Sequence, residues 1–128
     1  MTQYLTMDDA LQVTKTFGFH VRDAGLLASA LARPAASVFG DDAYPTIDHK
    51  AAALLESVLR SRPLVDGNKR TGWTLLVAFL WINGYRHDFA TDEAFDLVIG
   101  IADGQIDLAS SSATIEAHRV KSAPTHEK

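Results

Sequence analysis

Residues 60–71 read Arg-Ser-Arg-Pro-Leu-Val-Asp-Gly-Asn-Lys-Arg-Thr, a short polar stretch between two apolar segments. In the segment before it, residues 47–59, apolar side chains recur at helical spacing. In the segment after it, residues 73–82, the only polar side chain is Thr74. A helix without a polar face is expected to be buried on nearly all sides. The sequence therefore predicts an all-α bundle of about six helices around a buried central helix at about 69–82.

The start of this central helix has the chemistry of an anion site. The first N–H groups of a helix have no partner within it, and the helix dipole adds positive charge there. Lys69 and Arg70 raise that charge further, which is unfavourable unless an anion binds, so we expect a phosphate site. Gly67 allows close approach or a positive φ, Asn68 can cap the helix or hold the loop, and Asp66 is a candidate magnesium ligand. The alternative interpretation is an ordinary Asp-Gly-Asn turn followed by surface cations.

The same stretch resembles the signature of the Fic/Doc family. In the Doc branch of that family the signature reads His-Pro-Phe-x-Asp-Gly-Asn-Lys-Arg-Thr, which Pro63 and residues 66–71 match. Residues 25–34 and 83–85 are similar to two further segments of Doc-branch proteins, in the same order along the chain. The resemblance covers the region from about residue 20 to about residue 90 and implies an α-helical bundle with the motif loop and its helix at the centre.

Two residues depart from the Doc-branch signature, and one of them bears on chemistry. Leu64 stands where the family has Phe, and Arg62 stands where it has its catalytic His. A general base needs a free lone pair, and a guanidinium group offers only donors. The sequence therefore predicts a protein that is inactive or impaired, through a natural variation or a laboratory substitution at position 62.

The resemblance implies a toxin of a toxin–antitoxin module. Doc-branch toxins transfer the γ-phosphate of ATP to a threonine of elongation factor Tu and arrest translation, and a Phd-like antitoxin neutralises them. It implies Arg62 at the catalytic position and ATP with Mg²⁺ as cofactors, with Asp66 holding the metal or orienting the acceptor hydroxyl. The phosphate-binding residues expected by this analogy are Gly67, Asn68, Lys69, Arg70 and Arg60.

Three other functions stay open at this stage. A catalytically dead binding protein would keep the anion site and the partner surface but transfer nothing. An AMP transferase would use the same scaffold, although family members of that kind have Gly where this chain has Lys69. An α-helical domain without a nucleotide site would explain the helical pattern alone.

Composition limits the class of protein without identifying it. The 128 residues fit one domain, expected at 1–119, with 120–128 as a disordered tail. A net charge of −4 argues against direct nucleic-acid binding, and the absence of cysteine excludes disulfides and thiolate metal sites. We see no membrane span and no signal peptide, so we expect a cytoplasmic protein.

Local signals predict the outer helices. We expect N-caps at Thr6, Asp23, Thr46 and Asp107, an end of the central helix at Asn83-Gly84, and no sustained strand. Residues 1–5 are expected to be unanchored. Trp73 and Trp81 are expected in the core. The inner face of the helix that begins near Thr91 is expected to consist of Phe95, Val98, Ile99 and Ala102.

Overall fold

Two long antiparallel helices form the centre of the molecule. The computed structural model describes residues 1–122, and in it α3 (Ile47–Ser61) packs most extensively against α4 (Asn68–Ile82). Gly72 makes this close approach possible, because a Cβ atom there would lie 3.3 Å from Leu55 Cδ1. Leu75 and Leu76 of α4 are fully buried in the same core. The predicted all-α bundle around this helix is confirmed.

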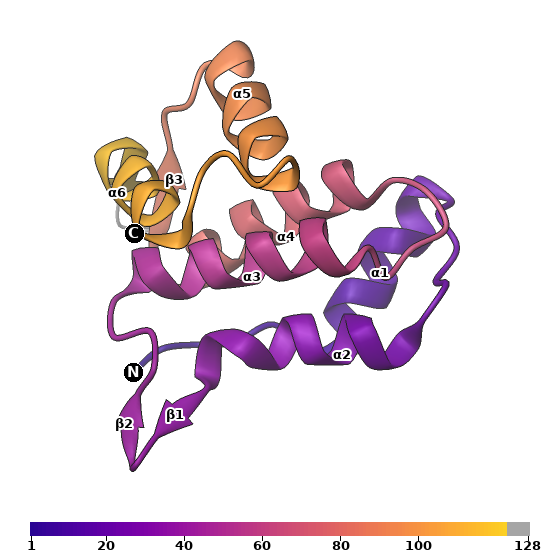
Figure 1. Cartoon of the computed structure of the whole chain (residues 1–128), viewed down its shortest axis with the longest axis horizontal. Helices are drawn as coiled ribbons and strands as arrows, with labels where there is room; N and C mark the ends of the chain where they lie inside the picture. The colour runs from indigo at the N-terminus through magenta and orange to yellow at the C-terminus, as the bar shows by residue number, and fades with distance from the viewer. Residues whose placement is uncertain (123–128) are drawn as a thin grey trace, which may run out of the picture.

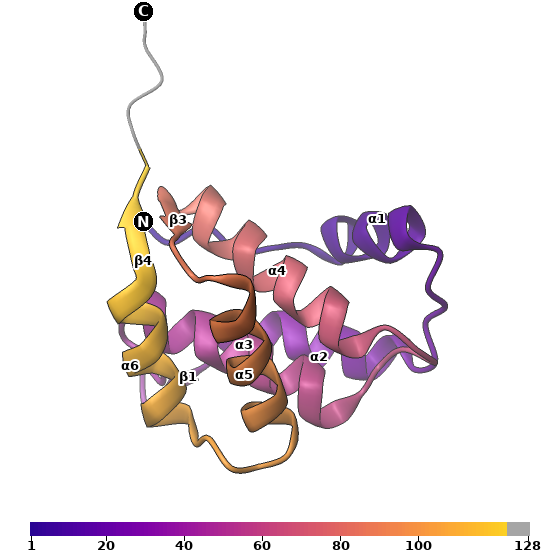
Figure 2. The same cartoon turned by 90° about the horizontal axis from the view of Figure 1, so that it is seen from above.

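The remaining helices cover the central pair on two sides. Figure 1 shows α2 along one side of α3, with α5 and α6 on the opposite side, and Figure 2 shows α1 beyond the edge of this stack. Together with α3 and α4, the described residues thus contain six α-helices and one 3-10 turn. Their bounds are Met7–Phe17 (α1), Ala24–Ala32 (α2), Arg33–Ala35 (the turn), Thr91–Ala102 (α5) and Leu108–His118 (α6). Within residues 1–122 no helix is both long and apolar enough to span a membrane.

Short strands complete the fold. β1 (Ser37–Val38) and β2 (Asp41–Asp42) form a hairpin, and β3 (Tyr85–His87) pairs antiparallel with β4 (Arg119–Lys121). Strands of two or three residues carry no alternating pattern, so the sequence did not reveal them. β4 also shows that the predicted boundary at 119 is wrong, because ordered structure continues past it. The rest of the predicted tail, residues 123–128, lies outside the described residues.

The predicted N-caps are confirmed at all four positions. The side chains of Thr6, Asp23, Thr46 and Asp107 each accept a hydrogen bond from the backbone N–H three residues later, at 2.8–3.2 Å. At α1 the Asp9 carboxylate also accepts from the Thr6 N–H at 2.8 Å, which completes a capping box. These caps satisfy helix N–H groups that would otherwise lack a partner within the helix.

The start of the chain is anchored, contrary to the prediction. The Gln3 N–H donates to Asn83 Oδ1 at 2.8 Å, and Asn83 Nδ2 donates to the Gln3 carbonyl at 2.9 Å. Tyr4 packs near Phe79 of α4, with ring centroids 6.2 Å apart. Asn83 thus uses its side-chain amide to bind the N-terminal segment at the end of α4, a long-range role that its position in an Asn-Gly pair does not reveal.

Three further predictions about burial are wrong. Trp81 is 59% exposed and Ile82 is 39% exposed, so the last turn of α4 is not buried on all sides. Phe95 is 63% exposed, and α5 buries Leu97 and Ile101 together with Val98, the one predicted inner-face residue that is buried. The predicted inner face of α5 and the face that is buried in the structure lie next to each other on the helix. Both consist of apolar residues, so periodicity alone could not decide between them.

Candidate anion-binding site

The loop between α3 and α4 begins at a residue with left-handed backbone. Arg62 has φ 53° and ψ 62°, and its N–H donates to the Val58 carbonyl at 3.1 Å. Pro63 follows it and disfavours the right-handed helical conformation at position 62. The chain therefore leaves α3 sharply at Arg62, and the loop turns back toward the start of α4 at Asn68.

Residues 20–23 hold this loop from outside. The Pro63 carbonyl accepts from the N–H groups of Arg22 and Asp23 at 2.8 and 3.0 Å, and Val65 N–H donates to the His20 carbonyl at 2.9 Å. The Arg22 guanidinium donates to the Arg62 carbonyl at 2.6 and 3.0 Å. The sequence analysis missed Arg22, since nothing local to it indicates a contact forty positions away.

Asn68 and Gly67 shape the loop from inside. Asn68 Oδ1 accepts from the Leu64 N–H at 2.9 Å, and Asn68 Nδ2 donates to the Leu64 carbonyl at 3.1 Å. Of its two predicted roles, Asn68 therefore holds the loop, and Gly67 is the N-cap without a capping side chain. Gly67 has φ +80°, and a Cβ atom there would lie closer than 3.0 Å to the Phe19 ring. Both the backbone angle and the packing require glycine.

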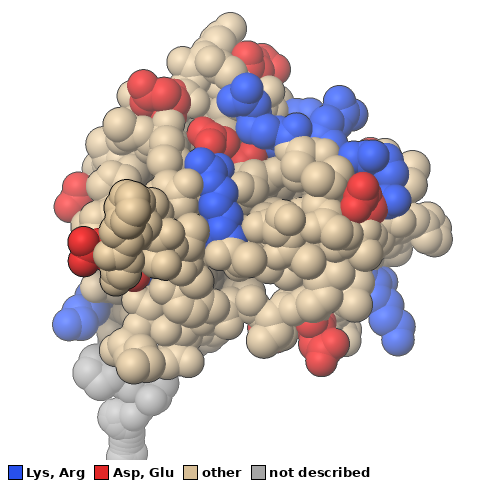
Figure 3. All heavy atoms as spheres, turned by 60° about the horizontal axis from the view of Figure 1, so that its bottom comes forward, with Lys and Arg blue, Asp and Glu red and all other residues tan. Residues whose placement is uncertain are grey.

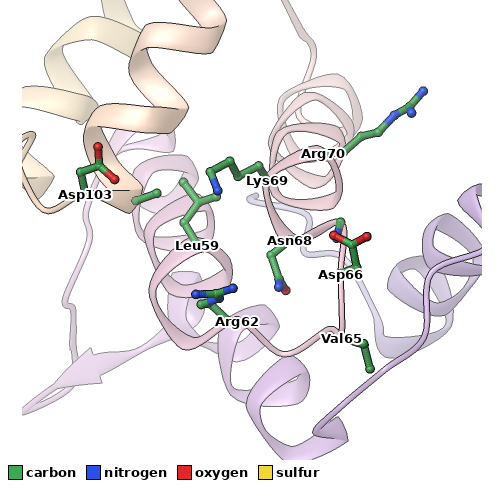
Figure 4. A pocket seen from close by; sticks show the side chains of 10 residues that line it. Leu59, Arg62, Val65, Asp66, Asn68, Lys69, Arg70 and Asp103 are labelled. Atoms are coloured by element: carbon green, nitrogen blue, oxygen red, sulfur yellow. The ribbon is translucent and has the colours of Figure 1, made fainter.

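A cavity of about 380 Å³ opens between this loop, the end of α3 and the end of α5. It is lined by six of the seven residues predicted for the site, namely Arg62, Asp66, Gly67, Asn68, Lys69 and Arg70. Figure 4 shows Lys69 reaching across the cavity, whereas the end of the Arg70 side chain extends away from it. Arg70 lies over the Phe17 ring at 4.6 Å from its centroid. The structure thus brings Arg62, Lys69 and the first turn of α4 to the same space, with Arg70 at its edge.

Arg60 is not among the residues that line this cavity. It lines an open cavity between α2 and α3, together with Arg33 and Glu56, and its guanidinium lies about 4 Å from where a Cβ atom of Gly104 would be, next to Asp103. Arg33 donates to Glu56 Oε1 at 2.9 Å and to the Tyr44 hydroxyl at 2.8 Å. Burial opposes the charge of Arg33, but these two partners outweigh it and raise its pKa above the ordinary value. Arg33 is therefore already paired, and the role predicted for Arg60, the second cation of that cavity, stays a prediction.

The far wall of the cavity comes from α5. Asp103 follows the last residue of α5 and lines the cavity opposite the motif loop, beside Ala102. Figure 4 shows the Asp103 carboxylate on the opposite side of the cavity from Asp66. Asp66 Oδ1 accepts from the Gly67 N–H at 2.8 Å. The sequence analysis missed Asp103, because an Asp before a helix-ending Gly is an ordinary end of a helix.

The charge distribution agrees with an anion site. In Figure 3 many of the Lys and Arg side chains gather toward the upper right, the side of the molecule on which α3 ends. In residues 1–122 no three His, Cys, Asp or Glu side chains are placed to hold a metal ion. A divalent cation in this cavity would therefore need oxygen ligands from a bound molecule as well as from the protein.

Comparison with known proteins now identifies the scaffold. The sequence model of the Fic/DOC family matches residues 3–80, from the N-terminal segment to the last turn of α4. The chain belongs to the Fic/DOC family. It is also similar to the protein named Toxin Doc from Mycolicibacterium smegmatis, with 48% identity over 120 residues that cover 90% of this chain and 92% of that protein. The resemblance to the Doc branch is thereby confirmed.

The structure places Arg62, which the sequence analysis matched to the His of the Doc-branch signature, in the lining of this cavity. Its side chain is exposed to solvent. Figure 4 shows the Arg62 side chain beside Leu59 and Asn68. The loop around Arg62 is held by the two hydrogen bonds between Asn68 and Leu64, so an arginine at position 62 is compatible with an ordered loop.

Proposed function

We propose that this Fic/DOC protein is the toxin of a toxin–antitoxin module and binds ATP at the start of α4. The observation that carries the proposal is the cavity in which Lys69 lies beside the first turn of α4. The first N–H groups of that helix have no partner within it, and they lie at the N-terminus, which is the positive end of the helix dipole. Phosphate groups would accept hydrogen bonds from these N–H groups and pair with Lys69, while Arg70 would add charge at the edge.

Magnesium would enter this site with the nucleotide. Mg²⁺ usually binds one or two carboxylates together with phosphate oxygens and water. Asp66 lines the cavity and uses one oxygen to accept from the Gly67 N–H, so its other oxygen is available to a metal. Asp103 on the opposite wall offers a second carboxylate. The residues present therefore fit a metal that binds only with its phosphates.

The reaction we propose is transfer of the γ-phosphate of ATP to a threonine of elongation factor Tu. A new bond forms between the threonine oxygen and phosphorus, the bond to the ADP oxygen breaks, and the hydroxyl proton must go to a base. Arg62 occupies the position of that base and cannot accept the proton, because guanidinium stays protonated. Arg62 would instead form a charge-assisted contact with the phosphates. The protein as written would therefore bind ATP and transfer phosphate slowly, which also fits a catalytically dead binding protein.

Comparing two histidine variants tests this proposal. Radiolabelled γ-phosphate transfer to elongation factor Tu is measured for the protein with Arg62, for Arg62→His and for the control Arg86→His, which makes the same exchange at an exposed position of β3, outside the cavity. We expect Arg62→His to be at least ~100-fold faster than the other two, the low end of what a general base contributes. Growth arrest on induction should follow the same order. Equal rates for all three would refute the assignment of position 62. Failure of every version to transfer would favour the binding protein.

We also propose a Phd-like antitoxin as the partner. The support is the similarity to a protein named Toxin Doc and the apolar surface left open at the end of α4, where Trp81 and Ile82 are exposed. Adjacent large apolar side chains that are exposed together are typical of surfaces that bind another protein. An antitoxin segment that forms a helix in a groove would cover such a surface.

A further inference from the structure

A second cavity lies directly beside the anion site. It has a volume of about 400 Å³ and lies between the first turns of α4 and α5, next to β3. Its walls are mostly apolar and aromatic, with Trp73, His87 and Phe89 on one side and Phe95 of α5 on the other. Lys69 and Arg70 line both this cavity and the anion site. The two cavities therefore adjoin at residues 69 and 70, with the Arg70 guanidinium at the edge, over the Phe17 ring.

The aromatic wall is held firmly from behind. The Trp73 ring meets Phe89 and His87 edge to face, with centroids 5.3 and 5.2 Å apart. Phe89 in turn stacks on His118 at 4.1 Å, and His118 Nδ1 lies 2.8 Å from Asp88 Oδ1. Four rings from α4, the β3 region and α6 thus support one another, so little ordering is needed when a ligand binds.

Phe95 differs from these residues because little covers it. Its side chain is 63% exposed, although it lies at the mouth of the cavity. The cavity that Phe95 and this aromatic cluster line has a volume of about 400 Å³, which is enough for a flat apolar ring. Aromatic and apolar side chains bind nucleobases by stacking, which needs only the π face that every base has.

We propose that this cavity holds the nucleobase of the nucleotide whose phosphates lie at the start of α4. This inference rests on the proposed function, because it assumes phosphates in the first cavity. Lys69 would lie next to the charged part of the ligand, where the two cavities adjoin, while Trp73 and Phe95 contact its flat apolar part. Since the walls offer few polar groups, the site recognises the shape of a base and discriminates weakly between adenine and guanine.

The test compares ATP with inorganic tripolyphosphate, which has the phosphates but no base. Affinities for both probes are measured for the intact wild-type chain, for Phe95→Ala and for the control Phe39→Ala, which removes a still more exposed ring at the β1–β2 hairpin. We expect Phe95→Ala to weaken ATP binding by about 5-fold or more, the lower range for loss of one stacking contact. Tripolyphosphate affinity should not change, and Phe39→Ala should leave both affinities as they are.

Fluorescence gives a second readout that does not require the Phe95→Ala variant to fold. The chain has two tryptophans, so Trp81→Phe leaves Trp73 as the only one. Stacking of a base near Trp73 should quench its emission with ATP and with GTP, and tripolyphosphate should not. Binding of ATP without quenching, and with unchanged affinity in Phe95→Ala, would overturn the nucleobase site and leave the phosphate site intact. If neither ATP nor tripolyphosphate binds, the proposed function fails and this inference fails with it.

Discussion

Replacing Gly67 with alanine should destabilise the protein more than the same change at Gly18. The two glycines have almost the same backbone, with φ 80° and ψ 18° at Gly67 and φ 79° and ψ 21° at Gly18. An alanine with left-handed backbone angles lowers the free energy of unfolding by about 1–2 kcal/mol at either position. At Gly18 nothing lies within 4 Å of the new Cβ atom, whereas at Gly67 it would overlap the Phe19 ring. Overpacking of this kind adds about 1–3 kcal/mol.

We therefore expect Gly67→Ala to lower the free energy of unfolding by about 2–5 kcal/mol and Gly18→Ala by about 1–2 kcal/mol. Urea denaturation of both variants measures the difference directly. A double variant separates the two causes: in a Phe19→Ala background, Gly67→Ala should cost no more than Gly18→Ala, because the overlap is gone. Equal costs for the two glycines in the wild-type background would refute the argument that Phe19 holds the motif loop.

Three further predictions concern pH, partner and salt. The Ser110 N–H bonded to Asp107 lowers the pKa of that carboxyl below its ordinary 3.8, so its stabilising effect is complete above that value and is lost as pH falls through the lowered pKa. When the pH is lowered from about 5 to about 3, the melting temperature of Asp107→Asn should therefore fall by less than that of the wild type. Equal falls in the two melting temperatures would contradict this. Co-expression with a small antitoxin encoded beside the gene should give a complex on gel filtration with a raised melting temperature, since a partner that binds only the folded state stabilises it. ATP binding should weaken strongly with salt and vanish when Lys69 and Arg70 are both alanine, and unchanged affinity would place the site elsewhere.

Local signals in the sequence were sufficient to predict most of the helical scaffold. The caps at Thr6, Asp23, Thr46 and Asp107 act within one helical turn, so the residues that make them are close in the sequence. The Asp-Gly-Asn-Lys-Arg run likewise placed five residues of the cavity, because a loop and the helix that follows it are continuous. The two roles left open for Asn68 could be separated only by the structure.

Long-range features could not be predicted in this way. Arg22 holds the carbonyl of Arg62, and Asp103 reaches the cavity from another helix, so neither has a signal in its neighbours. Whether Trp81 is exposed depends on which helices cover the last turn of α4, and the sequence does not show this. Hydrophobic content favours burial on average, but apolar side chains also make up much of any protein surface. The aromatic cavity was missed for the same reason, since Trp73 and Phe95 come together only when α4 and α5 pack.

The most direct test of the phosphate site is the response of backbone amides to ATP. In an NMR titration of the isotope-labelled protein at low salt, the largest shifts should fall on the N–H groups of residues 67–70. Lys69→Ala should reduce these shifts, and Lys15→Ala, which removes an exposed cation at the end of α1, should not. Shifts that fall mainly on other amides, or that persist unchanged in Lys69→Ala, would contradict the claim that the start of α4 binds the phosphates.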